Sequence, residues 1–159
     1  MAAELPPHGS WRINLGAGSL PEADWVNVDV ADIPGIDVVA DLDAFPWPFE
    51  DGVAERVKAF DIYEHVWHPL DFMRECWRIL RVGGVLNIHT AYWKNPNSYR
   101  DPDHKRFLTE ESWDYWVPGT YLNSRYGAAY ARGSHFEKVR VALDTPVGDL
   151  DVTLRKVAS

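Results

Sequence analysis

Two short segments near the N-terminus carry residues suited to holding a polar ligand. The run Asn14-Leu15-Gly16-Ala17-Gly18 follows an apolar stretch, and Asp29 comes at the end of the next apolar stretch. Glycine has no Cβ, so the chain can turn tightly at Gly16 and Gly18 and bring its backbone close to a ligand. A carboxylate at the end of the neighbouring strand can accept hydrogen bonds from both hydroxyls of a ribose. The combination predicts a site for an adenosine-type ligand.

The same loop disfavours other nucleotide sites. A dinucleotide fingerprint requires a third glycine at the position where Pro21 stands, and proline has no N–H to offer a pyrophosphate. Only residues 19–24 separate Gly18 from the next predicted strand, which leaves no room for a long helix. No Gly-Lys-Ser/Thr follows, so a P-loop is excluded.

Three histidines are candidates for acid–base chemistry, because a neutral imidazole near a reacting group can take up a proton. His65 follows the fourth predicted strand, His89 ends the fifth, and His104 lies in the polar segment 91–134. We favour His65 as a base because it follows its strand directly. The alternative is that His65 only lines the wall of a site through its hydrogen bonds.

A metal site is the next alternative, since Asp101-Pro102-Asp103-His104 combines two carboxylates with an imidazole. Carboxylates in such a loop also cap turns, and His104 can equally stack on an aromatic neighbour. The sequence has no H-x-x-x-H or paired-cysteine pattern. We therefore predict no metal site.

Seven predicted strands must position these residues. They cover residues 11–15, 25–30, 36–40, 56–62, 85–89, 136–143 and 150–157. An amphipathic helix opens at Pro69 and stops at Gly83-Gly84, and Thr109 caps a second helix that continues through Trp116. The first crossover is too short for a full helix, and we expect a single helical turn there. The order predicts an α/β fold: a Rossmann-like, mainly parallel seven-stranded sheet with helices on both faces and a C-terminal antiparallel hairpin.

The chain divides into a flexible leader, residues 1–10, and a single domain, residues 11–159. Within the domain, residues 91–134 are polar and aromatic and are predicted to form a substrate or lid segment. Their aromatic side chains suit either a substrate wall or a homodimer interface. These are Tyr92, Trp93, Tyr99, Trp113, Tyr115, Trp116, Tyr121 and Tyr126.

Composition narrows the possible partners. The net charge is −8 and the sequence has no long basic run, which argues against nucleic acid as a partner. The single cysteine, Cys76, excludes an intrachain disulfide. No signal-peptide pattern and no apolar run of membrane-spanning length is present, so we expect a soluble cytoplasmic protein without membrane contact.

Taken in order, these motifs resemble the class I S-adenosylmethionine-dependent methyltransferases, in particular short forms with a truncated first crossover. The similarity covers residues 11–91 and is carried by the runs RINLGAGSLPEADWVNVDV, VVADLDAFPWPFEDG, VKAFDIYEHV and FMRECWRILRVGGVLNIHT. Two positions depart from the family pattern: Asn14 stands where an acidic residue is usual, and Leu20 where a third glycine is frequent.

The resemblance implies that S-adenosylmethionine is the cofactor and that its methyl group goes to a small molecule or a short peptide-like acceptor. It assigns the amino-acid portion of the cofactor to the loop residues Asn14, Gly16, Ala17 and Gly18. It places the ribose at Asp29, the adenine at Asp41 and Leu42, and the junction with the substrate after the fourth strand, at Asp61 and Tyr63. Two alternatives stay open: a non-catalytic module of the same fold that binds the cofactor or a partner, and an enzyme that uses the cofactor for other chemistry.

Overall fold

The computed structural model describes residues 7–158. Residues 1–6 of the predicted leader lie outside the described residues. Residues 7–10 form a turn in which the backbone N–H of Ser10 donates to the carbonyl of Pro7, 3.0 Å away. The first strand follows directly, as the sequence predicts.

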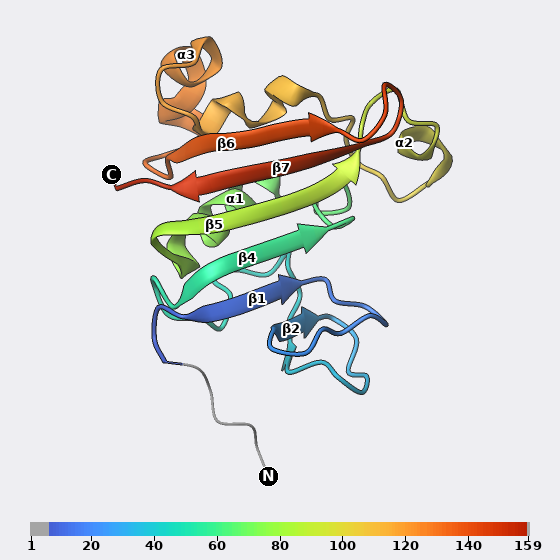
Figure 1. Cartoon of the computed structure of the whole chain (residues 1–159), viewed down its shortest axis with the longest axis vertical. Helices are drawn as coiled ribbons and strands as arrows, with labels where there is room; N and C mark the ends of the chain where they lie inside the picture. The colour runs from blue at the N-terminus through green and yellow to red at the C-terminus, as the bar shows by residue number, and fades with distance from the viewer. Residues whose placement is uncertain (1–6, 159) are drawn as a thin grey trace.

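The described residues form one seven-stranded sheet (Figure 1). Its strands are β1 (Trp11–Leu15), β2 (Val26–Asp29), β3 (Val38–Val39), β4 (Ala54–Phe60), β5 (Leu80–Ala91), β6 (Phe136–Leu143) and β7 (Asp149–Lys156). Their order in the sheet is β3-β2-β1-β4-β5-β7-β6. The first five strands run parallel, and β7 pairs antiparallel with both β5 and β6. The predicted mainly parallel sheet with a C-terminal antiparallel pair is confirmed.

Helix α1 (Pro69–Ile79) starts at the predicted proline and packs on the sheet through Phe72, Met73 and Cys76, which are fully buried. The 3₁₀ helix η1 (Glu110–Trp116) covers the same face, since its Trp113 packs against Tyr63, and Tyr63 in turn contacts Phe72 of α1. In Figure 1, α1 lies behind β5 and β7, and among the described elements no helix crosses the near face.

This arrangement differs from the expectation of helices on both faces. The β1–β2 and β2–β3 connections, residues 16–25 and 30–37, consist of turns and bends. The single helical turn expected in the first crossover is therefore wrong. A crossover this short has too few residues to form a turn of helix and still return to the start of a parallel strand.

The boundary between α1 and β5 also differs from the prediction. The helix ends at Ile79 and β5 begins at Leu80, before the Gly83-Gly84 pair. Ala54 pairs with Leu80 while Arg56 pairs with Val85, so residues 81–84 bulge out of the strand. The two glycines lie in this bulge, in which Gly83 has a φ of +79°.

Segment 91–134 contains two helices that the sequence analysis did not identify, α2 (Asn97–Arg100) and α3 (Tyr121–Tyr130). Thr109 caps η1 as predicted, in a reciprocal capping box with Ser112. Trp113 and Trp116 are buried in the core. No helix among the described residues is long and apolar enough to cross a membrane.

Candidate functional site

A cavity of about 250 Å³ lies where β1, β2 and β4 end. It brings together four residues that the sequence predicts to contact a cofactor, namely Gly16, Asp29, Asp41 and Leu42. Its remaining wall is mostly apolar. The full lining is Gly16, Asp29, Val30, Ala40, Asp41, Leu42, Asp43, Ile62, His65 and Val66. We refer to this space as the glycine-loop cavity.

The two glycines of the loop play different parts. Gly16 has a φ of +68°, and a Cβ placed on it would lie 2.1 Å from Cδ1 of Ile62. Only glycine allows the chain to pass this close to the side chain that follows β4. Gly18 has a φ of +53°, and no atom lies within 4 Å of where its Cβ would be. Its backbone therefore borders open space that a ligand can occupy.

Asp29 is held by the loop that it faces. Its Oδ2 accepts a hydrogen bond from the N–H of Gly18 at 2.8 Å, and its Oδ1 accepts one from the N–H of Ala31 at 3.0 Å. A carboxylate has about four lone-pair sites, so each oxygen can accept one more hydrogen bond. The two remaining acceptor positions match the two hydroxyls of a ribose. The residues present thus fit an adenosyl group.

Several predicted cofactor residues do not line this cavity. The buried side chain of Asn14 donates to Oδ1 of Asn27 at 3.0 Å, within a polar contact between β1 and β2. Ala17 is buried, and its N–H donates to the carbonyl of Val28. Tyr63 is 3% exposed, and its ring packs between Phe72 and Trp113 in the core.

A second cavity of about 490 Å³ adjoins the first, and we call it the histidine cavity. All three candidate bases, His65, His89 and His104, line it, and His65 also lines the glycine-loop cavity. The segment 97–104 supplies much of its wall. Its lining is Asp61, Glu64, His65, His89, Ala91, Asn97, Arg100, Asp101, Pro102, His104 and Asp149.

The wall of the histidine cavity is polar, so the aromatic side chains of segment 91–134, for which a substrate wall was one of two predicted roles, do not form it. None of the eight aromatic residues named for segment 91–134 belongs to the lining of the two cavities. Tyr99 is 60% exposed and stacks on Phe107 with ring centroids 4.5 Å apart. The aromatic side chains of the segment therefore divide between the core and the outer surface.

His89 forms an ion pair at the end of β5. Its Nδ1 lies 3.0 Å from Oδ1 of Asp61, and its Nε2 lies 3.8 Å from Oδ2 of Asp149. Burial lowers the pKa of His89, but the hydrogen bond and charge of Asp61, with the charges of Asp149 and Asp151, outweigh this and raise its pKa above the usual value. His89 is thus a stronger base than an exposed histidine.

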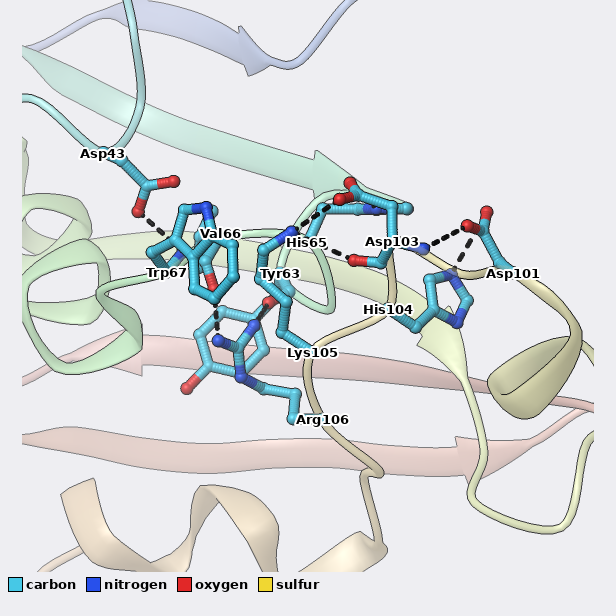
Figure 2. Close-up of polar contacts among 10 residues, drawn as sticks. All are labelled: Asp43, Tyr63, His65, Val66, Trp67, Asp101, Asp103, His104, Lys105 and Arg106. Carbon is cyan, nitrogen blue, oxygen red and sulfur yellow. Dashed lines mark hydrogen bonds and ion pairs between the residues drawn. The ribbon is translucent and has the colours of Figure 1, made fainter.

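The segment 103–106 is held against the turn that follows β4 (Figure 2). The guanidinium of Arg106 donates to the carbonyls of Tyr63 and Val66, and the N–H of Lys105 donates to the carbonyl of Glu64 at 2.9 Å. This role of Arg106 is not predictable from the sequence, because an arginine in a polar loop carries no signal of it. Its contacts bring segment 103–106 to the edge of the histidine cavity.

His65 and His104 meet as a result. Their rings lie edge to face, with centroids 4.7 Å apart and an interplanar angle of 74°. Nδ1 of His65 lies 2.9 Å from Oδ2 of Asp103, and Lys105 forms an ion pair with the same carboxylate (Figure 2). Two residues that are 39 positions apart in the sequence therefore lie side by side in the wall of the histidine cavity.

Known proteins resemble this chain in sequence and in fold. The profile of a family described as methyltransferase domain matches residues 16–88. A probable S-adenosylmethionine-dependent methyltransferase of Mycolicibacterium smegmatis is 34% identical over 64 residues, which are 40% of this chain and 25% of that protein. The chain thus spans about a quarter of the length of this curated relative.

Solved structures show the same fold. An S-adenosylmethionine-dependent methyltransferase from Archaeoglobus fulgidus superposes with a TM-score of 0.65 at 14% identity, covering 94% of this chain and 87% of that one. A 16S rRNA (adenine(1408)-N(1))-methyltransferase from Catenulisporales acidiphilia superposes with a TM-score of 0.53 at 17% identity, covering 92% and 84%. The predicted resemblance is confirmed: the chain is similar to the class I S-adenosylmethionine-dependent methyltransferases, in sequence over residues 16–88 and in fold across the sheet.

Proposed function

We propose that this chain binds S-adenosylmethionine in the glycine-loop cavity and transfers its methyl group to an acceptor in the histidine cavity. The observation that carries the proposal is that the two cavities meet at His65. A residue shared by both walls lies where a donor from one side and an acceptor from the other would come together. Holding two reactants in this way is the main contribution of an enzyme to a displacement reaction.

The residues of the glycine-loop cavity have distinct parts in holding the cofactor. Asp29 receives the ribose hydroxyls, and Leu42 with Val30 and Ile62 forms the apolar wall for the adenine. The open backbone beside Gly18 borders the amino-acid portion. When bound, the cofactor supplies an electrophilic methyl group on a sulfonium. The carboxylates of Asp61 and Glu64, which line the neighbouring cavity, favour that positive charge.

The histidine cavity indicates the kind of acceptor. Its volume of about 490 Å³ suits a small molecule or a short peptide-like group. Four carboxylate side chains and one arginine line it, which disfavours an acceptor that carries phosphates along a backbone. His65 and His89 are the side chains that we propose to take up a proton from the acceptor.

The first experiment is a calorimetric titration of the purified chain with S-adenosylmethionine and S-adenosylhomocysteine. We expect one saturable site, which Asp29→Ala weakens by about 10- to 100-fold because it removes two hydrogen bonds to a charged group. The matched control is Asp32→Ala, since Asp32 is an exposed carboxylate three residues further on. An absence of binding in folded wild-type protein would refute the proposal.

A non-catalytic module is the second candidate, and it is favoured by the short first crossover and by Asn14 at a position where the family usually has an acidic residue. The two candidates differ in turnover. Transfer of a radiolabelled methyl group to any member of a panel of hydroxyl, amine and carboxyl acceptors supports the enzyme. Cofactor binding of normal affinity without transfer across the whole panel supports the module.

A further inference from the structure

Three side chains at the edge of the histidine cavity form a cluster with the composition of a metal site. Glu64, His65 and His104 each present one potential ligand atom, and these three atoms all lie within 4.8 Å of one another. Glu64 and His65 follow β4, and His104 arrives from segment 91–134. Arg106 and Lys105 hold that segment against the turn after β4.

Two of the three side chains are buried with polar atoms that have no partner. Glu64 is 2% exposed, and its Oε2 accepts no hydrogen bond from any described residue. The side chain of His104 is 8% exposed, and its Nδ1 likewise lacks a partner among the described residues. Leaving such atoms unpaired in the interior costs about 1–3 kcal/mol each, and more for a charged group. A bound cation would satisfy both atoms at once.

Each of the two imidazoles has a carboxylate beside one of its ring nitrogens. Asp103 accepts a hydrogen bond from Nδ1 of His65, which leaves Nε2 of that ring as the nitrogen able to bind a metal. Asp101 lies 3.8 Å from Nε2 of His104, on the side of the ring away from its unpartnered Nδ1. A carboxylate behind a histidine is the usual support for a metal-binding imidazole, because it sets the tautomer and the ring orientation.

The charge around the cluster also favours a cation. The lining of the histidine cavity carries four carboxylates against one arginine. An excess of negative charge in a partly enclosed space attracts a cation and repels an anion.

We propose that Glu64, His65 and His104 bind one divalent transition-metal ion at the edge of the histidine cavity. Two imidazoles and one carboxylate suit Zn²⁺, Fe²⁺, Mn²⁺ or Co²⁺, whereas Mg²⁺ and Ca²⁺ prefer oxygen ligands alone. Metal–ligand distances of about 2.0–2.2 Å require the three side chains to draw together by small rotations. The sequence analysis predicted no metal site, since it considered only the carboxylates beside His104.

The metal would lie on the acceptor side of His65 and occupy its Nε2, so that with the metal bound His89 takes up the proton of the acceptor in place of His65. If the proposed methyl transfer holds, a bound ion there supplies a Lewis acid that orients an oxygen or nitrogen of the acceptor. Metal binding itself does not depend on that function, so the two proposals can fail separately.

The test is a titration of chelator-treated protein with ZnCl₂, followed by calorimetry, and with CoCl₂, followed by visible absorption. We expect one Zn²⁺ per chain and Co²⁺ d–d bands typical of imidazole and carboxylate ligands. Glu64→Gln, which is nearly isosteric, and His104→Ala should each lower the affinity by at least 10-fold. His89→Ala is the matched control, since His89 lines the same cavity but lies outside the cluster.

A measurement on the wild-type chain tests metal binding even if a variant fails to fold. In long-range ¹H–¹⁵N spectra, Zn²⁺ should shift the ring nitrogens of His65 and His104 and leave those of His8, His68 and His135 unchanged. Less than a tenth of a Zn²⁺ bound per folded chain, or shifts confined to other histidines, would overturn the proposal. Loss of Zn²⁺ binding in His89→Ala but not in Glu64→Gln would also overturn it.

Discussion

Gly16 passes so close to Ile62 that a Cβ on Gly16 would lie 2.1 Å from Cδ1 and 2.2 Å from Cγ1 of that side chain. The contact joins the end of β1 to the residue two positions after β4. Both Gly16 and Ile62 line the glycine-loop cavity, so this contact forms part of its wall. The loop can take this path only while position 16 has no side chain.

Replacing Gly16 by Ala should lower the free energy of unfolding by about 2–4 kcal/mol. The cause is overpacking against Ile62, added to the cost of a left-handed backbone. Gly18→Ala should cost only about 1–2 kcal/mol, since its φ is also positive but the space beside it is open. Urea denaturation measures both. The double variant Gly16→Ala/Ile62→Ala should lose less free energy of unfolding than the sum of the losses in the two single variants. Equal costs for the two glycine variants would contradict the close contact.

Asp61 should control the titration of His89. The folded-state pKa of His89 is raised, so this pair stabilises the fold at pH values below the unfolded pKa of about 6.5. That contribution is lost as the pH rises through the folded-state pKa. In Asp61→Asn the pKa of His89 should fall, as measured by NMR on metal-free protein. The loss of stability with rising pH should also become shallower. An unchanged pKa would show that Asp149 and Asp151 dominate instead.

The buried pair Glu75–Arg78 should be among the stabilising contacts of α1. Oε2 of Glu75 accepts hydrogen bonds from the N–H of Trp47 at 2.8 Å and from Arg78 at 2.7 Å. Glu75→Ala leaves a half-buried guanidinium without its main partner, so we expect a loss of about 3 kcal/mol in unfolding free energy. Arg74→Ala breaks a more exposed pair one turn away, with Asp71, and should cost under about 0.5 kcal/mol. Similar losses in both variants would contradict this account.

Arg106 should hold segment 91–134 against the turn after β4, at the edge of the histidine cavity. Its guanidinium donates to the carbonyls of Tyr63 and Val66, so Arg106→Ala removes two charge-assisted hydrogen bonds between segment 91–134 and the turn after β4. We expect the amide of Lys105 to exchange about 10- to 100-fold faster with deuterium. Arg125→Ala, on the exposed surface of α3, is the control and should leave that amide unchanged. Unaltered protection in Arg106→Ala would mean that other contacts hold the segment.

The sheet and the glycine-loop cavity were largely predictable from the sequence, because both depend on local patterns. The alternation before Asp29 and the glycines after β1 specify a strand, a turn and a carboxylate at its end, wherever the remainder of the chain lies. Pro69 and the apolar spacing after it specify α1 in the same way. Parallel strands then bring Gly16, Asp29 and Asp41 to one edge, since their carboxyl ends must coincide.

Tertiary structure alone decided the other features. The open face of the sheet follows from crossovers too short to hold a helix, and the burial of Tyr63 follows from the packing of η1 against α1. The meeting of Glu64 and His65 with His104 depends on Arg106 reaching two backbone carbonyls in another part of the chain. A carbonyl carries no sequence signal, because every residue has one. Contacts of this kind appear only when the chain is folded, and they build the polar wall of the histidine cavity.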